Sequence, residues 1–274
     1  MEYIRTYSAK GVLTALGKSL LYLLFFLAVQ FLAGIVYAAI AAGASLLPGG
    51  VDAESIMAGT ETAVLLTYLL TAAAIVLWFR LRHKPLGEAA GLRRCSGWTA
   101  AFCAFCAVDF FVVVQLTLAL LPAVWMTDYN DHMELLLSDG LIPALSITVA
   151  APLAEELMFR GVIQTRLERA MPVWAAVVLQ AVLFGVVHGT PIQMAYAFLL
   201  GLAFGFLRSR TGSILPGIAA HAAFNAMNDP LGIFGDAAGS WYALAVMAAV
   251  CAVGCVFCRR GLASLAATQN GRET

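Results

Sequence analysis

The sequence predicts an all-α fold, a polytopic transmembrane helical bundle of about eight spans with both termini on the cytoplasmic side. Hydrophobic residues make up 62% of the 274 positions and charged residues only 12%, whereas a soluble domain is about half apolar and a quarter charged. The apolar residues gather in long runs, and the basic residues recur in every second loop between them. No basic footprint of the kind that binds nucleic acid is present, so we expect the membrane bilayer, and no nucleic acid, as a partner.

The spans follow from the length of the apolar runs, because a transmembrane helix needs about 20 mostly apolar residues. Such runs lie near 19–46, 63–82, 98–126, 140–160, 172–190, 192–208, 213–229 and 240–258. The break at Gly189-Thr190-Pro191 is either a turn between two helices or a kink in one longer helix. The first run is too long for a signal peptide, so it is taken as a retained span.

The charges indicate the orientation, because Lys and Arg concentrate in cytoplasmic loops. The basic residues precede the first run, fill every second loop and follow the last run: Arg5, Lys10, Lys18, Arg80, Arg82, Lys84, Arg93, Arg94, Arg160, Arg166, Arg169, Arg208, Arg210, Arg259, Arg260 and Arg272. The opposite loops hold only acidic residues: Asp52, Glu54, Glu61, Asp128, Asp131, Glu134, Asp139, Asp229 and Asp236. We therefore predict a multi-pass protein of the cell membrane, with residues 1–274 forming one integral-membrane domain.

The fourth run carries ionisable residues in the order Glu155, Glu156, Arg160. Such groups are costly inside a membrane unless they are paired or face a polar cavity, so they indicate a functional site. Glu156 and Arg160 are four residues apart, with the acid first, which favours an ion pair on one helix face. Glu155 points about 100° away from that face and is left free to take a proton. Because it precedes Arg160 by five residues, we place it roughly 7–8 Å deeper, in the cytoplasmic half of the membrane.

Two later runs carry the other polar groups. His188 ends the fifth run, and the seventh run holds His221 and Asn225, which are four residues apart and share one helix face. If the fourth and fifth runs form a hairpin that turns near Met171-Pro172, Glu155 and His188 lie at similar distances from the turn. A carboxylate, an imidazole and an amide are therefore expected to converge.

These residues form three motifs in order along the chain, E-E-x-x-x-R, F-x-x-x-H and H-x-x-x-N. The set resembles the motifs of the CAAX-protease and bacteriocin-processing family of intramembrane endopeptidases, also called the type II CAAX protease or abortive-infection family. Each motif alone is weak, but three in order within a polytopic membrane protein are a specific signal. The resemblance covers about 142–228, and the remaining runs contribute only to the topology.

The resemblance implies hydrolysis of a peptide bond by a glutamate-activated water, in a membrane-tethered substrate that is prenylated or of the bacteriocin type. By analogy, Glu155 is the general base and His188 holds or polarises the water. His221 and Asn225 then stabilise the oxyanion of the tetrahedral intermediate.

Two further expectations depend on the same resemblance. Glu156 and Arg160 are expected to support the base structurally and electrostatically. The family is described as metalloproteases, so a divalent metal such as zinc, held by Glu155, His188 and His221, is a second possibility for activating the water.

Other interpretations stay open from the sequence alone. The same Glu and His side chains could form the ion site of a proton- or metal-coupled transporter, or a non-catalytic membrane scaffold could retain a protease-like site. Asp109 is an acid within the third run that the motifs do not explain. Cys103 and Cys106 have C-x-x-C spacing, but they lie in a continuous apolar run, which favours packing over zinc or redox chemistry.

Overall fold

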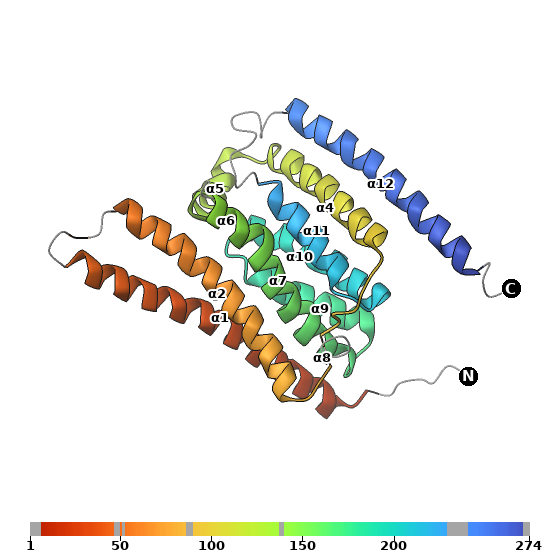
Figure 1. The fold of residues 1–274 in the computed structure, drawn as a ribbon, viewed down its shortest axis with the longest axis horizontal. Helices are drawn as coiled ribbons and strands as arrows, with labels where there is room; N and C mark the ends of the chain where they lie inside the picture. The colour runs from red at the N-terminus through yellow and green to blue at the C-terminus, as the bar shows by residue number, and fades with distance from the viewer. Residues whose placement is uncertain are drawn as a thin grey trace.

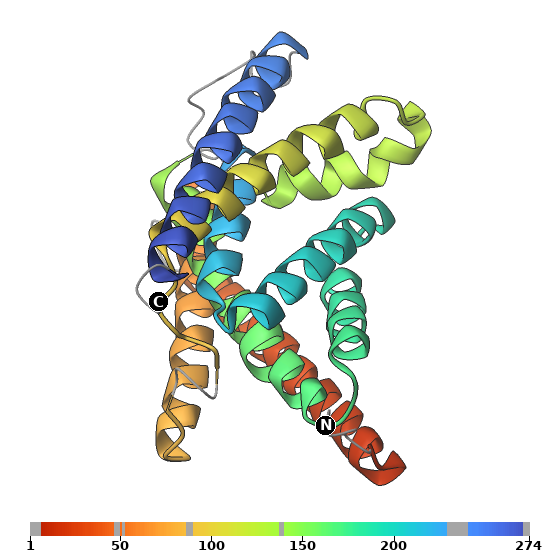
Figure 2. The same ribbon diagram turned by 90° about the vertical axis from the view of Figure 1, so that its right-hand side faces the viewer.

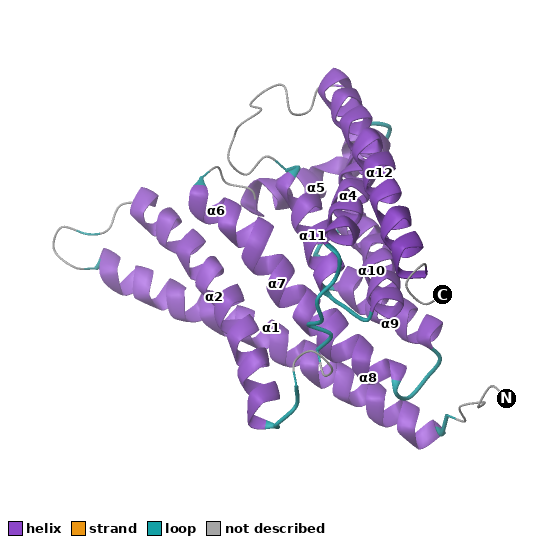
Figure 3. Ribbon diagram, turned by 45° about the vertical axis from the view of Figure 1, so that its right-hand side comes forward, coloured by secondary structure: helices purple, strands orange, loops and turns teal. Residues whose placement is uncertain are grey.

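All regular structure in the described residues of the computed structural model is helical, as Figures 1 and 3 show. The described residues are 7–46, 50, 53–85, 90–136, 140–228 and 241–270. The elements in chain order are α1 (Ala9–Ser45), α2 (Ala53–Leu81), α4 (Gly97–Leu118), α5 (Ala123–Leu136), α6 (Leu141–Leu145), η1 (Ser146–Ala150), α7 (Ala151–Glu156), η2 (Leu157–Gln164), α8 (Thr165–Glu168), α9 (Val173–Val186), α10 (Pro191–Thr211), α11 (Leu215–Ala226) and α12 (Trp241–Asn270). The all-α prediction is confirmed for these residues.

Several of the loop charges lie outside this part of the chain. They are Arg5, Asp52, Asp139, Asp229, Asp236 and Arg272. The orientation of the termini therefore stays a prediction from the charge pattern.

Each of the eight predicted runs contains a helix, and among the described residues six helices are long and apolar enough to cross a membrane. The two that fall short are α9, with 14 residues, and α11, with 12 residues. The prediction of eight spans counted apolar residues that lie in turns, such as those around Gly189 and Ser213. An apolar run therefore overestimated the length of the helix within it.

The segment Leu141–Glu168 is one continuous helix of 28 residues at the centre of the bundle. Two stretches of it, η1 and η2, have π-helical hydrogen bonding, and the N–H of Ala151 donates to the carbonyl of Ser146. The next residue, Pro152, has no N–H to donate to the helical hydrogen-bond ladder. The widened turn accommodates the proline within the helix. The helix continues through Pro152 and carries the two glutamates in its middle.

The break between α9 and α10 is a turn, and the alternative of a kinked single helix is excluded. Gly189 has a φ of +87°, which ends α9. Thr190 caps α10, because its hydroxyl accepts a hydrogen bond from the Gln193 N–H at 3.3 Å, and Pro191 occupies the first turn. The two helices pack closely, with the Gln180 amide donating to the Gly201 carbonyl at 2.7 Å.

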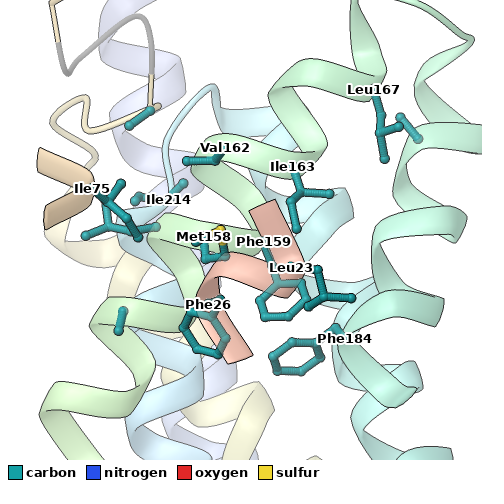
Figure 4. Close-up of a cluster of buried hydrophobic side chains, with 14 of the residues drawn as sticks. Leu23, Phe26, Ile75, Met158, Phe159, Val162, Ile163, Leu167, Phe184 and Ile214 are labelled. Atoms are coloured by element: carbon teal, nitrogen blue, oxygen red, sulfur yellow. The ribbon is translucent and has the colours of Figure 1, made fainter. Parts of the chain in front are cut away.

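The core of the bundle lies around the central helix. The rings of Phe26, Phe159 and Phe184 come from α1, η2 and α9, with centroid separations of 6.0 Å and 5.0 Å along the series. Figure 4 shows these rings among buried aliphatic side chains. Edge-to-face contacts of this kind contribute about 1 kcal/mol each beyond burial, and they hold α1 and α9 on η2.

On the other side of the bundle, α4 lies between α11 and α12, as Figures 1 and 2 show. The Cys255 thiol of α12 lies 3.6 Å from the Cys106 thiol of α4 and donates a hydrogen bond to Asp109 Oδ2 at 3.6 Å. Asp109 therefore takes part in the α4–α12 contact and does not line the cavity that contains Glu155.

Candidate active site

A cavity of about 140 Å³ lies where α7 and α11 meet the turn between α9 and α10. Its lining includes all four residues that were predicted to be catalytic, Glu155, His188, His221 and Asn225. Glu155 is contributed by α7, His188 follows α9, and the last two lie one turn apart on α11. The predicted convergence is therefore present, while the catalytic roles stay predictions.

Glu156 and Arg160 form a fully buried ion pair. Arg160 Nη1 lies 2.8 Å from Glu156 Oε1, and both side chains are 0% exposed. The guanidinium also lies over two rings, with its carbon 4.2 Å from the Phe184 centroid and 5.2 Å from the Phe204 centroid. The predicted pair is confirmed, and the aromatic faces complete its enclosure.

Arg160 lies in the helical segment η2 and not in a loop. It was grouped with the cytoplasmic loop charges, but it lies in the protein interior, where Glu156 compensates its charge. A buried arginine does not mark the membrane surface. The depth of Glu155 in the membrane, which was counted from Arg160, stays a prediction.

His221 lies between the two glutamates. Its Nδ1 is 3.2 Å from Glu156 Oε1, and its Nε2 is 3.7 Å from Glu155 Oε2. The ring is only 4% exposed and packs against Phe204, with centroids 5.3 Å apart. The ring hydrogen-bonds to Glu156 through Nδ1, whereas its Nε2 contacts Glu155 at ion-pair distance without a hydrogen bond. The ring thus ties the free glutamate to the paired one.

The close approach of α11 to α7 depends on Gly217. A Cβ atom at this position would lie 2.8 Å from Glu156 Oε2. Gly217 and His221 are four residues apart and therefore share the face that meets the glutamates. Sequence reasoning missed this residue, although its spacing from His221 is a signal that could have found it.

His188 is held by the last turn of α9. Its Nδ1 lies 2.6 Å from the carbonyl oxygen of Phe184, and its backbone N–H donates to the Gly185 carbonyl at 3.0 Å. A carbonyl only accepts hydrogen bonds, so Nδ1 carries the proton and Nε2 of the neutral ring is an acceptor. This leaves one nitrogen able to accept a hydrogen bond within the cavity.

Asn225 anchors α11 to the π-helical stretch η1. Its Nδ2 donates to the Ile147 carbonyl at 2.8 Å. A carboxamide NH₂ carries two hydrogens, so one N–H fixes the side chain and the second can serve another acceptor. The predicted oxyanion donor is thus oriented by the widened turn of the central helix.

The cavity also has polar lining residues that sequence reasoning missed: Tyr68, Gln193, Tyr196 and Asn228. Each lies in or next to an apolar run, where an isolated polar group has low cost only if it finds a partner or a cavity. The energetic cost of polar side chains in apolar runs could have identified these residues as functional candidates. It could not have shown which helices pack together around the cavity.

The predicted zinc site involved Glu155, His188 and His221. Among the residues that the structure describes, no three His, Cys, Asp or Glu side chains come together as a group that could hold a metal ion. His221 faces Glu155 and Glu156, and the Nδ1 of His188 is bound to the Phe184 carbonyl. Zinc binding therefore stays a prediction, and the reaction proposed for these residues uses no metal.

The fold and the cavity together define a class: a multi-pass membrane protein with a cavity lined by carboxylate, imidazole and amide groups. Residues 137–227 match the family described as type II CAAX prenyl endopeptidase Rce1-like and form a domain of that family, which consists of proteases. The match spans the central helix, both histidines and Asn225, and it confirms the resemblance expected over 142–228. The match over these residues implies intramembrane proteolysis. No curated protein and no solved structure matches the chain.

Proposed function

We propose that the protein is an endopeptidase that hydrolyses a peptide bond of a membrane-associated substrate with a water activated by Glu155. The observation that carries the proposal is the burial of the Glu155 carboxylate oxygen Oε2 without a hydrogen-bond partner in the described part of the chain. Glu155 Oε2 lies in the cavity wall, is buried, and has no hydrogen-bond partner among the described residues. A buried acceptor without a partner is costly to maintain, and it is suited to accept a proton from a bound water.

The reaction follows from the groups around the cavity. A water held by Glu155 and by the acceptor nitrogen of His188 attacks the scissile carbonyl carbon, and its proton passes to Glu155. The new C–O bond forms as the carbonyl electron pair moves to oxygen. The intermediate then collapses, the C–N bond breaks, and Glu155 returns the proton to the leaving amine. General base catalysis of this kind contributes about 10²- to 10⁴-fold to the rate.

Asn225 and His221 support different parts of this reaction in our proposal. The second N–H of the Asn225 amide donates to the oxyanion, a contribution of about 3–4 kcal/mol for one donor. His221 keeps the Glu155 carboxylate oriented, because its nitrogens face Glu155 and Glu156. This assigns His221 a positioning role beside the oxyanion role that the resemblance implied.

An apolar cavity next to the site supports a lipid-anchored substrate. This second cavity, of about 330 Å³, lies between α4, α10 and α11 and shares Leu200 with the catalytic cavity. Its lining includes Phe102, Phe110 and Phe204, and the last of these packs against His221. A hydrocarbon chain fits such a lining, and the family description names prenyl substrates. We therefore propose a prenylated tail as the first substrate to test.

The test is cleavage of prenylated, unprenylated and bacteriocin-type peptides by the full chain in nanodiscs. Glu155→Gln is expected to lower turnover about 10²- to 10⁴-fold, and Glu134→Gln, an exposed carboxylate on α5, is the matched control with unchanged turnover. A chelator arm tests metal dependence.

Retention of full cleavage by Glu155→Gln would overturn the proposal. Proton uptake that depends on Glu155 without any cleavage would support the transporter alternative, and substrate binding that survives every site substitution without cleavage would support the scaffold.

A further inference from the structure

A third cavity, which is apolar, lies beside the central helix, and its lining has no residue in common with that of the catalytic cavity. It is a trough of about 300 Å³ between α1, α2 and η2, and its lining includes Tyr22, Phe25, Ile75, Trp78 and Met158. One wall belongs to α1, whose apolar stretch is only 11% buried, and Phe25 is 50% exposed. The trough is therefore open along the side of the bundle that faces lipid.

The trough leads directly into a basic mouth. A neighbouring cavity shares Tyr22, Trp78 and Val162 with the trough, and adds Lys84, Arg166 and Arg169 to the lining. The sequence of the central helix explains the change of character, because Met158 and Val162 lie in η2, Arg166 lies in α8, and Arg169 is the C-cap of α8. Residues 158, 162, 166 and 169 follow one another at helical spacing, and the apolar Met and Val give way to two arginines.

The cations of the mouth have no ion-pair partner among the described residues. Within the described ranges, none of Lys84, Arg166 and Arg169 forms an ion pair with a carboxylate. Lys10 joins Arg166 and Arg169 in the next cavity along the surface, which contains no acidic residue. Lys84 and Arg169 are exposed, so the positive charge is available to a ligand.

Trp78 lies at the boundary of the two cavities. Its ring makes an edge contact with Tyr22, with centroids 5.8 Å apart, and the Arg82 guanidinium lies 5.7 Å from its centroid. Aromatic rings and arginines are enriched at the level of lipid headgroups. The boundary is thus where a membrane interface is expected, with the apolar trough on the hydrocarbon side.

We propose that this site binds one anionic phospholipid, with an acyl chain in the trough and the phosphate at Lys84, Arg166 and Arg169. A free phosphate would use the mouth alone and leave the apolar trough without a role. A zwitterionic lipid would fill the trough, but its own cation would oppose the three positive side chains. Each basic side chain near an anionic headgroup strengthens binding by roughly fivefold. The proposal does not depend on proteolysis.

The experiment uses the delipidated full chain in detergent. Phosphatidylglycerol and phosphatidylcholine with identical acyl chains are titrated, and bound lipid is counted by native mass spectrometry. The midpoint of thermal unfolding is the second measurement. We expect one equivalent of phosphatidylglycerol to bind at least tenfold more tightly than phosphatidylcholine, and to raise the midpoint.

Two sets of variants separate the parts of the site. Arg166→Gln with Arg169→Gln is expected to weaken phosphatidylglycerol binding tenfold or more, whereas Arg259→Gln with Arg260→Gln, on α12 at the far edge of the bundle in Figure 1, changes nothing. Ala74→Trp fills the trough and is expected to weaken both lipids. If the double arginine variant does not fold, Lys84→Gln carries the same test with about a fivefold effect.

Three outcomes would overturn the proposal. The first is equal affinity for the two lipids, and the second is unchanged phosphatidylglycerol binding in the folded basic variant. The third is an unfolding midpoint that inorganic phosphate raises as much as phosphatidylglycerol does, which would indicate a site for a soluble anion.

Discussion

Gly217 of α11 lies in direct contact with Glu156 of α7, so closely that an added Cβ would stand 2.8 Å from Glu156 Oε2. Gly217→Ala forces either the buried, ion-paired Glu156 carboxylate or α11 to shift, and His221 shares the face of α11 that would move. We expect overpacking to lower the free energy of unfolding by about 1–3 kcal/mol, and turnover to fall. Gly34→Ala is the control, because nothing lies within 4 Å of a Cβ there. Its unfolding midpoint is expected to stay or rise, and an equal loss in both variants would contradict the proposed contact.

The adjacent glutamates are expected to respond in opposite ways to the same substitution. Glu156→Gln leaves the fully buried Arg160 charge without its partner, which costs about 3–5 kcal/mol of stability. Glu155→Gln removes a charge that has no hydrogen-bond partner at Oε2, so its unfolding midpoint is expected to be unchanged or higher while turnover is lost. Thermal unfolding and cleavage are measured on both. A larger loss of stability in Glu155→Gln would reverse the assigned roles.

Asn225→Ala is expected to change both stability and turnover. It removes the hydrogen bond to the Ile147 carbonyl, a loss of about 1 kcal/mol, and it removes the proposed oxyanion donor, which lowers kcat by about 10²- to 10³-fold. Asn228→Ala is the matched control, because its amide donates to the Asn225 carbonyl and has no proposed catalytic part. If the two variants lose equal turnover, Asn225 is not the oxyanion donor.

Gly189 and Gly212 allow a test of the turn that carries His188. Both have a left-handed backbone, with φ of +87° and +67°, so alanine costs about 1 kcal/mol at either. Only at Gly189 would the new Cβ also approach a side chain, the His132 ring at 3.1 Å. We expect both variants to unfold at lower temperature and only Gly189→Ala to lose turnover. Equal turnover in both would show that the turn does not position His188.

The helices were predictable because the length and hydropathy of each apolar run identify it without knowledge of the helices that pack against it. The residues at which the helices end were less predictable. The turn at Gly189-Thr190-Pro191 depends on a left-handed glycine and a cap, and both are compatible with a kink when only the sequence is known. The short length of α9 and α11 was missed for the same reason, since hydropathy does not register where the hydrogen-bond ladder ends.

The candidate site was predictable where local spacing decides the geometry. The separation of Glu156 and Arg160 by four residues specifies a pair on one helix face, and the pair is present. The burial of Arg160 was not predictable, because it depends on rings from α9 and α10 that close over it. The position of His221 between two carboxylates is likewise a property of three-dimensional packing, which Gly217 makes possible.

The widened turns of the central helix make the site sensitive to chain length as well as to residue type. A π-helical turn accommodates an extra residue compared with an α-helical one. Deleting one residue within η1 therefore removes the widened turn and lets the ladder close as an α-helix. Asn225 would then lose the Ile147 carbonyl that accepts its N–H at this turn. Insertions and deletions in Ser146–Ala150 are therefore a route by which descendants of this chain can uncouple oxyanion stabilisation from the base without changing either residue.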